Sequence, residues 1–405
     1  MRKTTGALLP EPIDYETDKL HAALRYQDKQ TQLEFAYQGS LFYNNAESLT
    51  WQDPFDLTRT GRQALEPDNQ MHQLSAIIGH MLSPSSRLTA VASLVQQTQD
   101  ERFLPYSSSD TVASLPRSSL DGEVWIMRGQ LKLTSRPMRK LRLSAQYSYS
   151  ERDNKTDTET YAYFVADGIS GVDIPNKSWP KENDPLSYRR NKIDLTANYR
   201  ISSKMSLRGG YHYNHMHRDS NDQERETTRE HSLKAKWKIK ATPALNLALY
   251  GEATKRAGSD YHTRRDENPA MRTFYLADVD RSKLGASLNY MASDRLNLGV
   301  TAEYLDDDYS DSTLGLTEAQ QPSLLLDATY QINERTSTHA YYNREEFKSQ
   351  NAGIQNRQVT LPDWHARLKD SIDSVGLGVK FTGLLDKWVV GTDLVHTRSR
   401  GAVSY

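Results

Sequence analysis

The sequence predicts an all-β protein, an antiparallel up-and-down transmembrane β-barrel with about sixteen strands. Two observations carry this prediction. Apolar and polar residues alternate along arms of about a dozen residues, which is long enough to cross a bilayer when tilted. Short turns join the arms in pairs and long polar connections separate the pairs, an asymmetry typical of outer-membrane barrels. A soluble array of β-sandwiches is the alternative, but sandwich strands are shorter.

The clearest pair of arms runs from Tyr188 to His217. Neighbouring side chains of an extended strand point to opposite faces, so each arm has one apolar and one polar face. In the first arm the apolar positions are Ile193, Leu195, Ala197 and Tyr199, and in the second they are Met205, Leu207, Gly209, Tyr211 and Tyr213. Closure into a barrel is expected because an open sheet edge in lipid leaves backbone groups unpaired.

Eight pairs of arms follow one another and form a single transmembrane domain over residues 1–405. We expect the short turns, such as Ser202–Lys204 and Ser293–Arg295, to face the periplasm, and long loops such as Asp153–Pro185 to face outside. The last turn lies near Leu385 and Asp386. The pairs are Leu20–Tyr26 with Leu33–Tyr37, Met71–Leu82 with Arg87–Gln97, Gly122–Ser135 with Leu141–Tyr149, Tyr188–Arg200 with Met205–His217, Arg229–Lys240 with Leu245–Arg256, Ser282–Met291 with Leu296–Asp306, Leu324–Ile332 with Thr336–Phe347, and Ser371–Thr382 with Trp388–Thr397.

Composition narrows the classes of function. The 405 residues include 23 Tyr and 6 Trp, which suit membrane–water interfaces, and no Cys, which excludes disulfides and haem attachment through Cys-x-x-Cys-His. The net charge of -1 does not suggest a nucleic-acid partner. No apolar run is long enough for a membrane helix or for a signal peptide. An exported barrel needs such a signal, so we expect either that it has been removed or that the chain is a fragment.

Charged residues at every second position indicate the wall of a lumen. A lysine on the lipid face near the midplane costs about 2–4 kcal/mol, so these side chains are expected to point inward, and Leu195, Leu207, Leu247 and Leu298 outward. Such a wall either faces water in a pore or contacts a guest protein. The expected inward cations are Lys132, Arg142, Lys192, Arg208, Lys234, Lys236, Lys238, Lys240, Lys283 and Lys380, with the carboxylates Asp194, Glu303, Asp327 and Asp393.

Sites for metals or catalysis find little support. His215 and His217 share a strand face, but His212 lies on the other, so the three rings are not expected to converge on one ion. The acidic run from Asp306 to Asp311 lacks the order of ligands that a calcium loop has. No Gly-x-Ser-x-Gly elbow, P-loop or Gly-x-Gly-x-x-Gly fingerprint is present. We therefore expect no enzyme activity.

Three stretches resemble a known family, the MtrB/PioB outer-membrane barrels associated with decahaem cytochromes. They are Asp121-Gly-Glu-Val-Trp with its arm to Ser135, the arm and loop KLRLSAQYSYSERDNKT from Lys140, and the hairpin YRRNKIDLTANYRISSKMSLRGGYHYN from Tyr188. The likeness extends over nearly the whole chain in alternation, turn style and loop proportions. It differs in lacking the Cys-x-x-Cys of many members and in having fewer strands, so we expect a partial chain of a larger barrel.

The resemblance implies a sheath in the Gram-negative outer membrane. Such a barrel holds a periplasmic, MtrA-like decahaem c-type cytochrome, and an extracellular, MtrC-like multihaem cytochrome docks outside. Electrons pass along haem c groups carried by these partners, and the barrel itself binds no cofactor and no metal. The alternative is a general diffusion porin for small solutes, and a third possibility is a surface receptor or adhesin that uses the long loops.

Overall fold

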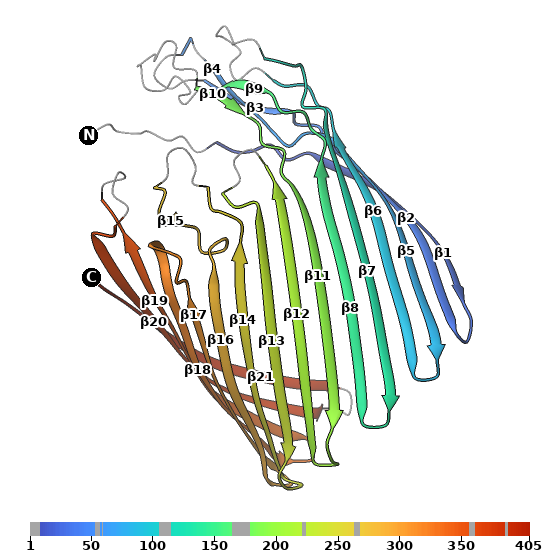
Figure 1. Cartoon of the computed structure of the whole chain (residues 1–405), viewed down its shortest axis with the longest axis vertical. Helices are drawn as coiled ribbons and strands as arrows, with labels where there is room; N and C mark the ends of the chain where they lie inside the picture. The colour runs from blue at the N-terminus through green and yellow to red at the C-terminus, as the bar shows by residue number, and fades with distance from the viewer. Residues whose placement is uncertain are drawn as a thin grey trace.

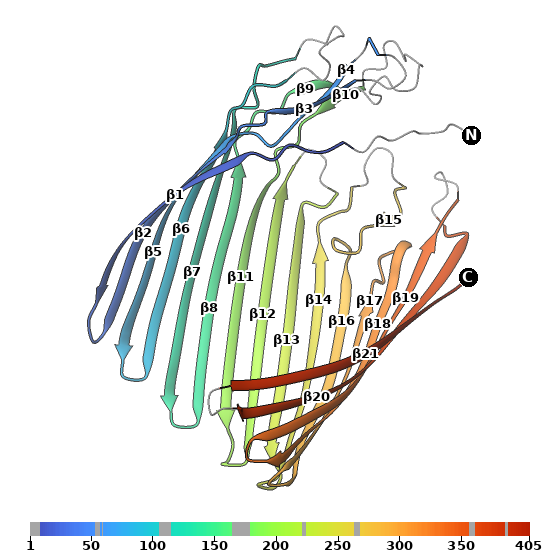
Figure 2. The same cartoon turned by 180° about the vertical axis from the view of Figure 1, so that it is seen from behind.

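The computed structural model describes residues 9–52, 57–58, 60–104, 115–163, 179–220, 224–262, 268–355, 361–384 and 388–405. These residues form one large antiparallel sheet of seventeen strands and two small two-stranded sheets. The large sheet contains sixteen long strands and the two-residue strand β15. The all-β antiparallel fold expected from the alternation is therefore confirmed. The sheet curves strongly, with β1 and β21 at its two ends (Figures 1 and 2).

The strands alternate between short turns and long connections, as the loop lengths predict. The long strands are β1 (Tyr15–Gln27), β2 (Thr31–Asn44), β5 (Asn69–Ser83), β6 (Ser86–Gln99), β7 (Gly122–Met138), β8 (Leu141–Asn154), β11 (Ser187–Arg200), β12 (Met205–Asp219), β13 (Thr227–Lys240), β14 (Leu245–Gly258), β16 (Val279–Ser293), β17 (Leu296–Asp308), β18 (Leu314–Asn333), β19 (Thr336–Gly353), β20 (Trp364–Leu384) and β21 (Trp388–Ser404). The short ones are β3 (Ser48–Gln52), β4 (Thr60–Ala64), β9 (Thr160–Tyr163), β10 (Trp179–Glu182) and β15 (Met271–Arg272).

Each long strand pairs with the next long strand in the chain. The eight predicted pairs are all present as hairpins, and the hairpins join side by side, for example through β2 with β5 and β8 with β11. The short turns lie together at one end of the sheet, and the long connections lie at the other (Figure 1). The turn between β20 and β21, expected near Leu385 and Asp386, lies outside the described residues.

The register of the strands separates two faces. Directly paired residues point to the same side of an antiparallel sheet. Lys236 pairs with Arg208 on β12 and with Tyr250 on β14, and this side is called the charged face. Its neighbour Trp237 pairs with Leu207 and Leu249, and that side is called the apolar face.

Several strands extend farther than the alternation predicts, mainly toward the long connections. The expected arms Leu324–Ile332 and Ser371–Thr382 become the much longer β18 and β20. In the added part of β18, Gln320 and Gln321 are polar on both sides of the strand. Backbone pairing continues there although the period of two has ended, so the predicted arms correspond only to the part with an apolar face.

The ends of the strands near the long connections carry the only described cluster of buried apolar side chains. Ala277, Val279 and Tyr309 are each at most 5% exposed, and Leu314 is fully buried. The short strand β15 pairs in parallel with Leu314 and Gly315 of β18. Gly315 has φ +98, and a Cβ there would lie 2.8 Å from the Arg272 carbonyl oxygen, so only glycine fits this pairing without strain.

Candidate functional site

The charged face brings all the predicted inward residues together. The chain of paired residues links Arg142, Asn198, Arg208 and Lys236 across four strands. By the same register, the sheet places the ten predicted cations and four predicted carboxylates on this one face. The four leucines expected on the opposite side lie on the apolar face. The period of two in the sequence therefore corresponds to two distinct faces of the sheet, and that the charged face points inward stays a prediction.

Ion pairs cross the strands in the middle of the charged face. Lys234 Nζ lies 2.9 Å from Glu252 Oε1, and Lys283 Nζ lies 2.9 Å from Glu303 Oε2. The Tyr250 hydroxyl donates to Glu303 at 2.6 Å, and Lys236 Nζ lies 4.7 Å from the centre of the Tyr250 ring. These contacts order a band of opposite charges that runs from β13 to β17.

In the described structure, most of the ten predicted inward cations are not paired with a carboxylate. Within the described residues, eight of the ten have no ion pair: only Lys234 and Lys283 contact a carboxylate. Lys238 and Lys240 are exposed at the end of β13 near the short turns. With Arg142 and Arg208 they surround a hollow of about 670 Å³ that Arg139, Lys140 and Lys204 also line. The charged face is therefore strongly basic near the short turns and more evenly charged in its middle.

The apolar face provides the contrast. Over β11 to β14, four successive side chains of each strand on this face are uncharged, from Tyr199 to Ile193 and from Leu207 to Tyr213 in the first two strands. This part of the face, next to the short turns, and its uncharged continuation over β16 to β19 are called the apolar band. Large apolar side chains are well exposed there, among them Leu233 at 63% and Leu284 at 68%. Such a continuous apolar surface is energetically costly in water and favourable in lipid.

The histidines and the acidic run are distributed over both faces of the sheet. His212 Nδ1 lies 2.6 Å from Asp194 Oδ1 on the charged face, whereas His215 and His217 lie on the opposite side. The carboxylate of Asp307 is held by Arg281, while Asp306 points to the other face. In the described ranges, no three histidine or acidic side chains are placed to hold a metal ion.

A group of buried charges beside the long connections was not predicted from the sequence. Arg225 is 6% exposed, donates from Nε to the Ser259 carbonyl at 2.8 Å, and lies 2.6 Å from Asp278 Oδ1. Arg256 donates to the carbonyls of Ala277 and Phe274. These contacts fix the β14–β16 connection to the strand ends. In the sequence, this buried group is indicated only by the apolar pair Leu276-Ala277 within an otherwise polar connection.

The carboxyl of Asp311 in this region has altered acidity. The pKa of Asp311 is raised, first by its hydrogen bond with the Asp278 carboxyl and then by burial and by the charge of that carboxyl. Arg225 and Lys255 oppose this effect. A second carboxyl nearby disfavours the charged form of the first and so favours its protonated form.

In the described part of the chain, no helix has the length and apolarity needed to cross a membrane. A family model described as a putative outer membrane beta-barrel porin, MtrB/PioB, matches residues 2–405. The chain is 29% identical over 401 residues to the outer membrane protein MtrB of Shewanella baltica (strain OS185). That match covers 97% of this chain but 56% of the relative, so the chain spans little more than half the length of that protein.

Solved structures of outer-membrane proteins share the fold. The FrpB iron transporter from Neisseria meningitidis (F3-3 variant) aligns with a TM-score of 0.56 at 12% identity, covering 95% of this chain and 60% of the transporter. The copper transporter OprC aligns with a TM-score of 0.55 at 9% identity, covering 96% and 62%. Identities this low show the fold alone. The family match over residues 2–405 shows that the chain belongs to the MtrB/PioB family of outer-membrane β-barrel proteins.

Proposed function

We propose that the charged face lines a lumen that encloses a periplasmic, MtrA-like multihaem c-type cytochrome, and that an extracellular, MtrC-like cytochrome docks at the end with the long connections. In this arrangement the partners carry the haem groups, and the barrel insulates and positions them across the outer membrane. The observation that carries the proposal is the basic, largely unpaired charged face opposite a continuous apolar band. Membership of the MtrB/PioB family supports the general role.

Side-chain crowding supports the charged face as the inner one. Several small side chains within the strands on this face are at most 8% exposed, including Val95, Ser232, Ala248 and Thr254. Side chains on the concave side of a curved sheet converge and cover one another, whereas those on the convex side spread apart. The high exposure of Leu233 and Leu284 on the apolar face fits the convex side.

Cations on the lumen wall suit a guest with anionic groups. Haem propionates and surface carboxylates of a cytochrome are negatively charged, and complementary charge sets the register and rate of association more than bulk affinity. The unpaired Lys238 and Lys240, with Lys234 and Lys236 on the same strand face, are the residues best placed to meet such a guest. Because exposed pairs contribute only about 0.2–1 kcal/mol each, they act as a group.

The test replaces Lys234, Lys236, Lys238 and Lys240 together by Glu. We expect the variant to insert normally, to retain less of the haem protein on purification, and to transfer electrons more slowly to an external acceptor. The matched control is the quadruple change to Arg, which keeps the charge and should keep the partner. Unchanged retention of a haem protein by the Glu variant would overturn the role of these lysines.

A general diffusion porin is the second candidate, because the family model itself is described as a porin. In a porin, the same change to Glu should shift ion selectivity toward cations and leave no redox activity to alter. Single-channel selectivity of the purified barrel, measured beside co-purification of a haem protein, separates the two functions. Reversed selectivity in a barrel that never binds a haem protein would favour the porin.

We also propose that the short turns face the periplasm and the long connections face outside, as loop-length asymmetry indicates. Labelling of whole cells with a membrane-impermeant reagent should then reach a cysteine introduced at Asp184 in the long β8–β11 connection. It should not reach one introduced at Ser203 in the β11–β12 turn. The reverse pattern would invert the orientation.

A further inference from the structure

The apolar face changes character beyond the apolar band, on the side of the long connections. Six cations gather there on three adjacent strands, and together they are called the basic patch. They share the apolar face because Arg344 pairs with Leu324 on one side and with Asp373 on the other. The basic patch consists of Arg344 and Lys348 on β19, Arg367 and Lys369 on β20, and Arg398 and Arg400 on β21.

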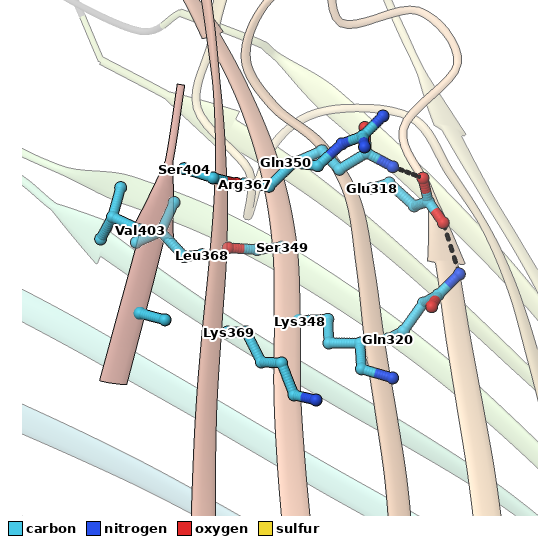
Figure 3. Close-up of a pocket in the computed structure, with 11 residues that line it drawn as sticks. Glu318, Gln320, Lys348, Ser349, Gln350, Arg367, Leu368, Lys369, Val403 and Ser404 are labelled. Carbon is cyan, nitrogen blue, oxygen red and sulfur yellow. Dashed lines mark hydrogen bonds between the residues drawn. The ribbon is translucent and has the colours of Figure 1, made fainter. Parts of the chain in front are cut away.

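The carboxylates in the patch do not balance these cations. Glu346 alone contacts three of them, with its oxygens 2.7 Å from Arg344, 3.2 Å from Lys348 and 3.5 Å from Lys369. Asp373 contacts Arg344 at 3.6 Å. Glu318 instead accepts hydrogen bonds from the side-chain amides of Gln320 and Gln350 (Figure 3). Within the described residues, Arg367, Arg398 and Arg400 have no ion pair, so the patch carries an excess of positive charge.

Three of the six cations line a hollow with room for a ligand. Its volume is about 490 Å³, and Lys348, Arg367 and Lys369 line it together with Gln350. Figure 3 shows the Lys348 and Lys369 side chains lying next to each other and extending in the same direction. Their side chains are 40% and 52% exposed, so both ammonium groups are accessible. Two adjacent ammonium groups with one shared carboxylate favour a ligand that brings further negative charge.

The position of the patch indicates the kind of ligand. Arg344 lies two residues beyond Tyr342, the last uncharged side chain on this face of β19 before the cations, and Lys348 lies six residues beyond Tyr342. At about 3.3 Å per residue the cations span about 7–20 Å along the strand from the apolar band, less in depth because strands tilt. The nearest of these cations therefore lies at the level of the polar headgroup layer next to the hydrocarbon core, and the others lie farther out on the side of the long connections.

We propose that the basic patch binds the phosphorylated headgroup of a glycolipid in the outer leaflet, which in a Gram-negative outer membrane is lipopolysaccharide. Arg and Lys are the side chains that recognise phosphate, through paired donors and through point charge respectively. The patch is local: at the same level of the apolar face, β16 and β17 present Asp280, Asp306 and Asp308 instead. The assignment to the outer leaflet depends on the orientation proposed above. The binding of a phosphorylated headgroup by the basic patch does not depend on that orientation.

The test compares two triple variants of the full chain by native mass spectrometry, with bisphosphorylated lipid A and with its dephosphorylated form as probes. The patch variant carries Lys348→Gln, Arg367→Gln and Lys369→Gln. The matched control carries Arg189→Gln, Arg229→Gln and Lys255→Gln, three cations on the same face beyond the band but dispersed over β11, β13 and β14. Arg189 and Lys255 already pair with Glu151 and Asp280.

We expect the patch variant to bind bisphosphorylated lipid A about tenfold more weakly than the unchanged chain, and the control to stay within about twofold. Equal loss in both variants, or equal binding of dephosphorylated lipid A by the unchanged chain, would overturn the proposal. If the patch variant does not fold, the double change Lys348→Arg with Lys369→Arg takes its place. This change keeps the positive charge, so the variant should still bind bisphosphorylated lipid A. Loss of binding would contradict recognition by the charge of the patch. Cytochrome retention, measured on the same variants, should not change and so keeps this test separate from the proposed function.

Discussion

The two ends of the sheet are stabilised in different ways. At the short turns, hairpins close through a few residues, and polar contacts such as those of Asp28 stay exposed. At the long connections, the strands extend beyond the apolar band. Buried apolar and charged side chains pack against one another there, as in a small soluble domain. The same strands are therefore stabilised in two ways. Near the short turns they depend on backbone hydrogen bonds and on lipid, and near the long connections they depend on a buried core of side chains.

This difference predicts how each end responds to substitution. Contacts at the long connections are buried and specific, so breaking them should be costly but local. At the level of the apolar band, the two faces of a strand have different surroundings. The same substitution should therefore destabilise the protein on the apolar face and not on the charged face. Contacts at the short turns are solvated and should contribute little.

The largest effect is expected from Arg225→Ala beside the long connections. Arg225 is almost fully buried against Asp278, so its removal should destabilise this region by about 3–5 kcal/mol, the range for breaking a buried ion pair. Hydrogen exchange should show lost protection in residues 268–278, with the long strands unaffected. Arg229→Ala, at a nearby exposed arginine, is the control and should change nothing measurable. Loss of protection throughout the sheet would show that the two ends are not independent.

The next largest effect is expected from Leu195→Arg in the apolar band. An arginine facing lipid near the midplane should destabilise the barrel by about 2–4 kcal/mol. Thr196→Arg is the matched control, because the neighbouring position points to the charged face, opposite Gly210. Heat stability of the barrel on gels and equilibrium unfolding measure both variants. Equal destabilisation by the two changes would contradict the assignment of the faces.

A smaller effect is expected from Arg281→Met. Arg281 donates to both oxygens of Asp307 at 2.6 and 2.7 Å, and Asp307 is 3% exposed. Because the arginine itself is 42% exposed, the loss should lie near the lower end of the range of about 1–3 kcal/mol for an orphaned buried group. Adding Asp307→Asn should recover part of the loss in denaturant unfolding. No recovery in the double variant would mean that the pair itself contributes little.

The smallest effect is expected at the β1–β2 turn. Backbone amides of Gln30 and Thr31 donate to Asp28 Oδ1 at 2.7 and 2.6 Å, and these bonds, with one from Tyr26, lower the pKa of Asp28. The contribution to stability is therefore present above the ordinary pKa of about 3.9 and is lost as the pH falls through the lowered value. The protection of the Thr31 amide from hydrogen exchange, measured against the intrinsic exchange rate at each pH, should fall on acidification. Asp28→Asn should remove that pH dependence, and an unchanged pH profile in the variant would exclude Asp28 as its source.

The difference between the two ends of the sheet also explains how much of the structure could be predicted from the sequence. The eight hairpins and the two faces follow from alternation, because lipid on one side and charge on the other impose a period of two on residues such as Leu207 and Arg208. The extra length of β18 could not follow from it, since Gln320 and Gln321 are polar on the two faces. In the added part of β20, the apolar residues Trp364, Ala366 and Leu368 lie on the charged face instead. The buried group around Arg225 also escaped prediction, because its partners Ser259 and Asp278 lie far along the chain and contribute backbone oxygens or isolated charges.

The pairing of each long strand with its neighbour in the chain has a consequence for how the protein forms. The longest gap between consecutive long strands runs only from Asn154 to Ser187, and most gaps are far shorter. Low separation between contacting segments favours rapid folding, because each new hairpin closes a small loop onto an edge that already exists. We expect the strands to become protected in chain order from one growing edge, and pulse-labelled hydrogen exchange during assembly into vesicles would show whether protection spreads from β1 to β21 or appears in all strands at once.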